Sequence, residues 1–180
     1  MSDRAGRVIL GLDPGTASTG YGVVSVIGNR VRMVDYGVVR TPAKMPLETR
    51  LRKLFEELGE VLNRYRPDST AVESLFFNTN VSTALAVGHA RGVALLACSQ
   101  CDCPVFEYTP QQIKMAVVGY GKASKEQVME MVRVLLALKE APRPDHAADA
   151  LGVAICHANS RRIEEKVARE LAGAEGKAEG

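Results

Sequence analysis

Residues 8–15 read Val-Ile-Leu-Gly-Leu-Asp-Pro-Gly, an apolar run that ends in a carboxylate and a turn. The run predicts a buried strand with Asp13 at its carboxyl end. Because a buried carboxylate is costly unless a cation neutralises it, Asp13 is a candidate metal ligand. The alternative is that Asp13 caps the turn, which a lone Asp-Pro-Gly favours. The small residues around Asp13 predict room for a phosphate or a metal ion to approach the backbone.

The rest of the chain predicts an α/β fold. Apolar runs over 21–27 and 31–40, separated by a Gly-Asn turn at 28–29, predict an antiparallel meander with the first strand. Helical periodicity or helix-start signals mark residues 47–65, 79–97, 110–116, 125–138 and 145–160, and short strands are predicted at 69–73 and 104–108. This order predicts a mixed five-stranded sheet with helices on both faces.

The composition is that of an ordinary globular protein. The 180 residues are 46% hydrophobic and 24% charged, with a net charge of +2, so a basic surface has to arise from local clustering. We expect one domain over residues 1–160 and a charged, disordered tail over 161–180. No apolar stretch reaches the ~18 residues that a membrane span needs, and no signal core precedes the first strand. These features predict a cytoplasmic protein with no membrane partner.

Three of the four cysteines are crowded together. Cys98, Cys101 and Cys103 have a spacing that suggests zinc, but Cys156 stands alone and no histidine pair accompanies the cluster. Because zinc folds usually show two spaced pairs, we favour reduced thiols at a helix end, with a metal site as the alternative. Disulfides are disfavoured in a reducing compartment.

A second carboxylate, Glu73, also ends an apolar strand. If its strand neighbours that of Asp13, both carboxylates lie at one edge of the sheet. Two such charges repel each other unless divalent metal ions lie between them.

The third acidic element is Asp-His-Ala-Ala-Asp at 145–149, at the start of the last helix. Helical spacing places Asp149 on a face with both His146 and Asp145, and it does not decide between these two as its partner. The preceding Pro144 also makes Asp145 a candidate N-cap. Together the three elements predict one cluster that holds Mg²⁺ or Mn²⁺. A pair of such ions ~3.5–4 Å apart is the arrangement that cleaves phosphodiesters.

Several motifs in one order resemble the RuvC family of Holliday junction resolvases, in the ribonuclease H-like superfamily. They span roughly residues 8–157: Gly-Leu-Asp-Pro-Gly at 11–15, Gly-Tyr-Gly at 20–22, Ala-Val-Glu-Ser-Leu-Phe at 71–76, Gly-His-Ala-Arg-Gly at 88–92, Val-Phe-Glu-Tyr-Thr-Pro at 105–110, Lys114 with Val-Val-Gly at 117–119, and Asp-His-Ala-Ala-Asp-Ala-Leu at 145–151. The resemblance implies a metal-dependent endonuclease of recombination and repair. Such an enzyme binds a four-way junction as a homodimer and nicks it symmetrically, with two Mg²⁺ or Mn²⁺ ions per active site. RuvA and RuvB are its implied partners.

By this resemblance, Asp13, Glu73 and Asp149 correspond to three of the family's catalytic, metal-binding acids. His146 falls on the fourth position, which many members fill with Asp. That departure puts the charge and geometry of one ion in question but not the reaction, because neutral imidazole also binds Mn²⁺-type metals.

The resemblance also implies three DNA-binding residues. Lys114 and Lys125 correspond to phosphate contacts near the active site, and Phe76 corresponds to an aromatic residue that stacks on bases at the junction. From the residues alone, lysines on a helix are usually a solvated face and a Phe pair is usually core.

Two alternative functions belong to other classes. A nucleotide-binding protein of the actin and Hsp70 type begins with a similar Asp turn, but it needs a second lobe for which 180 residues leave no room. A junction-binding module without catalysis is disfavoured because all three carboxylates are present.

Overall fold

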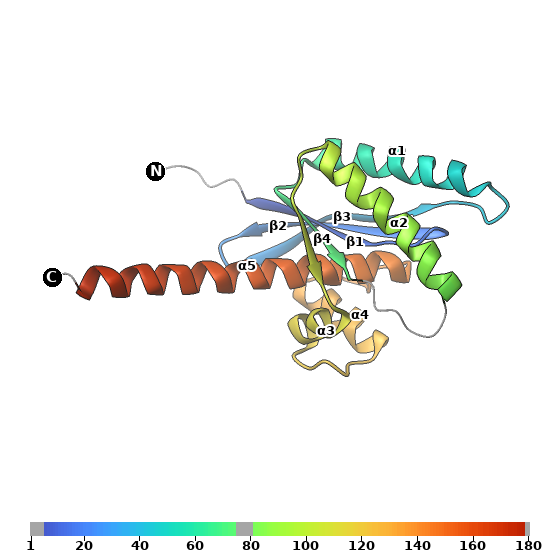
Figure 1. Ribbon diagram of the computed structural model, residues 1–180. Helices are drawn as coiled ribbons and strands as arrows, with labels where there is room; N and C mark the ends of the chain where they lie inside the picture. The colour runs from blue at the N-terminus through green and yellow to red at the C-terminus, as the bar shows by residue number, and fades with distance from the viewer. Residues whose placement is uncertain (1–5, 75–80, 179–180) are drawn as a thin grey trace.

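A five-stranded sheet lies between two layers of helices in the computed structural model, which describes residues 6–74 and 81–178 (Figure 1). The strand order is β3-β2-β1-β4-β5. β1 pairs antiparallel with β2 and parallel with β4, so the sheet is mixed, as predicted. The strands are β1 (Arg7–Asp13), β2 (Ser18–Ile27), β3 (Arg30–Arg40), β4 (Ser69–Glu73) and β5 (Val105–Tyr108).

Helices cover both faces of the sheet, which also confirms the prediction. α1 (Leu47–Tyr65) and α2 (Val81–Gln100) lie on one face. On the other face lies the long α5 (Asp145–Ala178), and α3 (Pro110–Val118) and α4 (Lys125–Leu135) pack against it (Figure 1). The bounds of α1 and β4 are those predicted, and the other elements except α5 differ by a few residues at their ends.

The two-residue period of the strands sorts their side chains between two cores. On β1, Leu10 and Leu12 join the core under α1 and α2, with Leu54 and Leu58 of α1. Ile9 points the opposite way and joins the core under α5. Each strand residue therefore belongs to one face according to its position in this alternation.

The last helix continues beyond its predicted end. We expected it to stop at residue 160 and a disordered tail to follow, but α5 extends to Ala178. The segment after 160 is rich in Ala, Glu, Lys and Arg, which favour helix, and Arg161 pairs with Glu164 at 3.0 Å. An ion pair between Arg7 and Glu165 also ties this segment to β1. The predicted helix end is therefore wrong, and the division into one domain and a tail stays a prediction.

In the described ranges, no helix combines the length and apolar character needed to cross a membrane.

Candidate metal centre

The α5 side of β1 ends in Asp13. Ile9 and Gly11 precede it at two-residue intervals, so all three point toward α5. The Asp13 side chain is only 18% exposed. The strand alternation therefore delivers a largely buried carboxylate to the place where α5 begins.

Three glycines let the backbone of α5 lie directly on the sheet. A Cβ atom on Gly11 would come within 2.0 Å of the Ala150 carbonyl oxygen, and one on Gly20 within 1.9 Å of the His146 carbonyl oxygen. On Gly22 it would meet the Leu151 side chain at 2.7 Å. We expected the small residues near Asp13 to leave room for a phosphate or a metal ion. That expectation is wrong for these glycines, because the helix itself fills the space.

This close packing brings His146 and Asp149 to Asp13. The distance from His146 Nδ1 to Asp13 Oδ2 is 2.7 Å. One ligand atom from each of Asp13, His146 and Asp149 lies within 4.8 Å of the others. Among the described residues, this compact set includes His146 and not Asp145, whose carboxylate lies 3.4 Å from the Lys125 ammonium. Asp145 is the first residue of α5.

Glu73 enters the same region from the end of β4. Burial raises the pKa of Glu73 to about 7, and the negative charges of Asp13 and Asp149 add to the rise, while Lys114 opposes it. Burial and Asp13 likewise raise the pKa of Asp149. Glu73 is not among the described residues whose ligand atoms lie within 4.8 Å of one another. It shares with Asp149 a pocket of about 210 Å³.

The two predicted DNA-binding lysines line this pocket. Lys125 Nζ lies 3.2 Å from Asp149 Oδ2 as well as close to Asp145. Burial lowers the pKa of Lys125, but the two carboxylates outweigh it, so the pKa lies above its usual value. Lys114 interacts electrostatically with Glu73. Both lysines therefore supply positive charge directly beside the acids.

Capping boxes fix the helices that carry these lysines. At the start of α3, Thr109 Oγ1 accepts from the Gln112 amide at 3.1 Å, and Gln112 Oε1 accepts from the Thr109 amide at 2.8 Å. Ser124 and Gln127 make the same reciprocal pair before α4. Both helix starts confirm the sequence prediction, and they hold the first turns of α3 and α4 at the pocket.

The loop after Asp13 is held by residues that sequence reasoning missed. Thr41 donates a backbone hydrogen bond to the Ala17 carbonyl at 3.1 Å and a hydroxyl hydrogen bond to the Thr16 carbonyl. Arg50 Nε donates in turn to Thr41 Oγ1 at 2.8 Å. Arg50 belongs to a run of mixed charges on α1, so nothing in its sequence surroundings separates it from ordinary surface residues.

Phe76 lies outside the described residues. The cysteine cluster is described, and all four thiols are free. Cys98 and Cys103 both contact the Thr70 hydroxyl, at 3.6 and 3.2 Å. Within the described part of the chain, the cysteines do not form a set of ligand atoms as compact as the acidic cluster.

The donors in the cluster suit a hard or borderline divalent cation. Carboxylate oxygens and an imidazole nitrogen are ligands that Mg²⁺ and Mn²⁺ accept. An octahedral ion with bonds of ~2.1 Å touches atoms up to ~4.2 Å apart, so the observed spread needs only small side-chain adjustments. Burial, and after it the neighbouring carboxylates, raise the pKa values of Glu73 and Asp149, and a bound cation would lower both.

Comparisons with known proteins place the chain in one family. The family model described as "Crossover junction endodeoxyribonuclease RuvC" matches residues 9–157. A RuvC from Desulforamulus reducens is 59% identical over 151 residues, covering 84% of this chain and 93% of the relative. A RuvC from Rubrobacter xylanophilus is 53% identical over 163 residues, covering 91% of each chain.

Solved structures agree with the sequence relatives. The structure of T. thermophilus RuvC in complex with a Holliday junction substrate has a TM-score of 0.84 and 43% identity, and the match covers 88% of this chain and 96% of that one. The yeast mitochondrial Holliday junction resolvase Ydc2 shares the fold alone, with a TM-score of 0.59 and 15% identity over 83% of this chain and 78% of that one. These relatives do not support the two alternative functions. The chain has a ribonuclease H-like fold and belongs to the RuvC family of crossover junction endodeoxyribonucleases.

Proposed function

We propose that Asp13, Glu73, His146 and Asp149 form the metal centre with which this RuvC-family endonuclease cuts four-way DNA junctions. One observation carries the proposal. Side chains from the ends of β1 and β4 and from the first turns of α5 converge on one half-buried region with excess negative charge. None of these side chains is needed there for the apolar core. Their convergence is explained if they hold cations.

The four proposed ligands would serve two metal ions, and two lysines would bind the DNA. Asp13, His146 and Asp149 hold one ion, and Glu73 completes the site for a second from the neighbouring strand. When bound, a pair of Mg²⁺ or Mn²⁺ ions would activate the attacking water and stabilise the leaving 3′-oxygen. Lys114 and Lys125 attract the DNA phosphates to the same pocket.

His146 tunes this site. Its imidazole would offer the metal a nitrogen ligand beside the carboxylate oxygens. Imidazole is also a softer ligand than carboxylate, which favours Mn²⁺ over Mg²⁺. We therefore expect Mn²⁺ to support faster cleavage than Mg²⁺, and His146→Asp to shift the preference toward Mg²⁺.

A four-way junction as substrate suggests an oligomeric state and partner proteins for this chain. A four-way junction with two-fold symmetry matches a homodimer that carries two active sites, which gives symmetric paired nicks. Phe76, three residues after Glu73, is the candidate for stacking on bases at the junction. RuvA and RuvB, proteins of branch migration, are the proposed partners. Four free thiols support a reducing cytoplasm as the location.

The test separates cutting from binding. Asp13→Asn and Glu73→Gln keep the side-chain shape and remove the negative charge. Cleavage of a four-way junction in Mg²⁺ or Mn²⁺ is expected to fall by several orders of magnitude, while binding of the junction survives. Glu60→Gln, an exposed carboxylate on α1, is the matched control and should cut normally. Equal loss of binding and cutting would show instead that the acids serve the fold, and unchanged cutting would exclude them from the site.

A further inference from the structure

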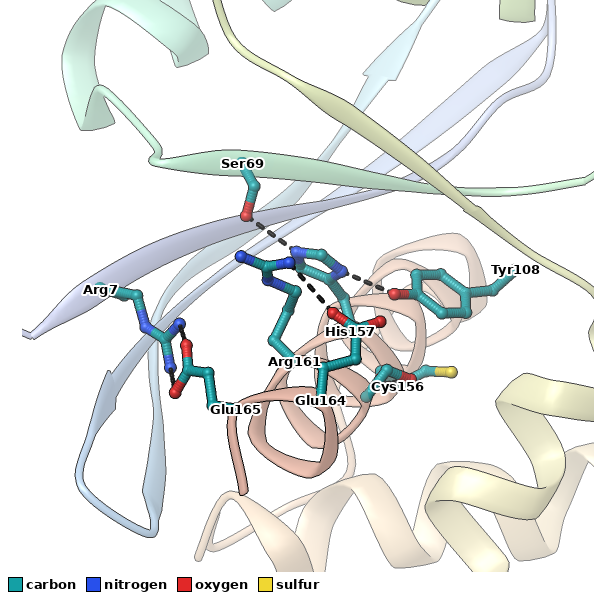
Figure 2. Close-up of polar contacts among 9 residues, drawn as sticks. Arg7, Ser69, Tyr108, Cys156, His157, Arg161, Glu164 and Glu165 are labelled. Carbon is teal, nitrogen blue, oxygen red and sulfur yellow. Dashed lines mark hydrogen bonds and ion pairs between the residues drawn. The ribbon is translucent and has the colours of Figure 1, made fainter. Parts of the chain in front are cut away.

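A buried histidine on α5 has no part in the proposed chemistry. His157 has 0% exposed surface, and both of its ring nitrogens are hydrogen-bonded. Nε2 lies 2.9 Å from Ser69 Oγ, and Nδ1 lies 2.8 Å from the Tyr108 hydroxyl. Figure 2 shows the imidazole lying between these two side chains, which reach it from β4 and β5. Three elements therefore meet at one ring.

The two partners of His157 are tied to the strand that carries Glu73. Ser69 is the first residue of β4, and Glu73 is its last. Tyr108 pairs with Glu73 in the β4–β5 register. Ser69, Ala71 and Glu73 alternate onto the α5 face. One row of β4 side chains thus runs from Ser69 at His157 to Glu73 in the pocket that it shares with Asp149.

The spacings along the strand and the helix match. Ser69 and Glu73 are four strand residues apart, which is ~13 Å. His157 and Asp149 are eight helical residues apart, which is ~12 Å. Because Ser69 contacts His157 while Glu73 shares a pocket with Asp149, α5 runs antiparallel to β4. The contact between Ser69 and His157 at one end of β4 therefore places Asp149 beside Glu73 at the other end of the strand.

We propose that the Ser69–His157–Tyr108 bridge is a positioning device that sets the register of α5 on β4 and so aligns the ligands of the metal site. A slip of α5 by one residue would move Asp149 by ~1.5 Å and turn it by ~100°. The apolar side chains around it tolerate such a shift better than directional hydrogen bonds do. This inference rests on the proposed metal centre and assigns it three residues that do not touch the metal.

The chemistry of the ring suits this role. A neutral imidazole carries one N–H donor and one acceptor, and two hydroxyl groups satisfy both. Burial, reinforced by Arg161 and Arg7 and opposed by Glu164, lowers the pKa of His157 to about 4, so the ring is neutral near pH 7. Phe106 packs on the ring with centroids 4.6 Å apart, and Arg161 lies over Phe106 at 5.5 Å. Figure 2 shows Arg161 beside the ring and the Arg7–Glu165 pair farther along α5.

The test uses substitutions that remove one hydrogen bond at a time. Tyr108→Phe and Ser69→Ala each delete one partner of the ring, and His157→Leu deletes both. Tyr65→Phe is the matched control, because it removes a tyrosine hydroxyl bound to Asp35 on the opposite layer. Mn²⁺ affinity is measured from the electron paramagnetic resonance signal of the free ion, and junction cleavage is measured across a Mn²⁺ titration.

We expect His157→Leu to weaken Mn²⁺ binding about tenfold, within the range seen when residues that orient metal ligands are lost. The single deletions should weaken it less, and cleavage at saturating Mn²⁺ should return close to the native rate. His157→Gln, which keeps one hydrogen bond, should recover part of the affinity. Tyr65→Phe should leave Mn²⁺ affinity unchanged even where it lowers the melting temperature.

The positioning role is overturned if folded Tyr108→Phe and Ser69→Ala bind Mn²⁺ with native affinity and differ from the native protein only in a lower melting temperature. The bridge would then only stabilise the fold. These two variants keep the test decisive if His157→Leu does not fold. Asp13→Asn separates this outcome from failure of the metal centre. If Asp13→Asn also binds Mn²⁺ normally, the metal site itself is misplaced, whereas loss in Asp13→Asn alone rejects only the bridge.

Discussion

The two faces of the sheet are built from the same strands but in different ways. Toward α1 and α2, the strands present Leu10, Leu12 and Val72, which pack on the leucines of α1. Toward α5, the same strands present Gly11 and Asp13 on β1 beside apolar residues such as Ile9 and Val24. Both faces bury apolar side chains, but only the α5 face also brings a helix backbone close enough to gather charged groups.

The two faces are therefore expected to differ in how much they contribute to folding stability and to the metal site. The α1 face is stabilised by the burial of apolar side chains such as Leu10 and Leu12. The α5 face buries apolar side chains as well, but it also holds Glu73 with a pKa of about 7 and a fully buried histidine. We therefore expect substitutions on the α1 face to lower the unfolding free energy alone, and substitutions on the α5 face to change Mn²⁺ affinity as well.

The largest effects are expected from one substitution on each face of the sheet. Gly20→Ala places a Cβ against the His146 carbonyl, so α5 must shift, and we expect a loss of about 1–3 kcal/mol in unfolding free energy. Because the shift moves His146 and Asp149, Mn²⁺ affinity should also fall. Leu12→Ala on the opposite face should cost about 2–5 kcal/mol and leave Mn²⁺ affinity near native. Urea unfolding and Mn²⁺ titration measure both quantities, and equal losses of affinity in the two variants would remove the distinction between the faces.

A smaller effect of opposite sign is expected at Glu73. Its folded pKa of about 7 lies above the ordinary carboxyl value of 4.5, so its favourable contribution is complete below pH 4.5 and is lost as the pH rises through 7. Without metal at pH 8, Glu73→Gln should therefore stabilise the protein, by about 1–2 kcal/mol once solvent screening is allowed for. Urea unfolding in a chelator at pH 5 and pH 8 checks this. A destabilised Glu73→Gln protein at pH 8 would show that Glu73 is not under electrostatic strain.

His157 should show the reverse dependence on pH. Its folded pKa of about 4 lies below the ordinary imidazole value of 6.5, so its contribution is present above pH 6.5 and is lost as the pH falls toward 4. We expect His157→Gln to be less stable than the native protein at pH 7, with a difference that shrinks by about 2 kcal/mol toward pH 4.5. Thermal unfolding at these two pH values is the measurement. A difference that stays constant would mean that His157 does not titrate in this range.

The smallest effect concerns Lys125. Lys125→Gln should weaken junction binding modestly and lower the slope of log affinity against log salt by about one phosphate contact. Lys53→Gln is the matched control, because Lys53 is paired with Glu57 on α1 at 3.4 Å. Fluorescence anisotropy with a labelled junction over a salt series gives both slopes. If the two variants have the same slope as the native protein, Lys125 makes no phosphate contact.

Local patterns in the sequence were sufficient for most of the fold. The capping boxes at Thr109 and Ser124 and the period of α1 depend on neighbours a few residues away, so they are visible in the chain itself. The end of α5 was missed because charge and alanine are compatible with both a tail and a solvated helix. The Arg7–Glu165 pair is among the contacts that distinguish these, and it joins residues far apart in sequence.

The candidate site was predictable in its residues but not in its arrangement. Strand ends marked Asp13 and Glu73, while helical spacing left His146 and Asp145 equivalent. The rotation of α5, to which its packing on Gly11 and Gly20 contributes, brings His146 to Asp13, and helical spacing alone does not reveal it. Those glycines were the available signal, and we interpreted them as space for a ligand. His157 gave no signal, since its partners lie on two separate strands.

The most direct test of the metal centre is the coordination of Mn²⁺ in the free protein. Electron spin-echo spectroscopy of bound Mn²⁺ detects nitrogen nuclei that ligate the ion. We predict a nitrogen coupling in the native protein and in Glu60→Gln, and its loss in His146→Asp, which should still bind Mn²⁺. A native protein that binds Mn²⁺ without any nitrogen coupling would contradict the placement of His146 among the ligands.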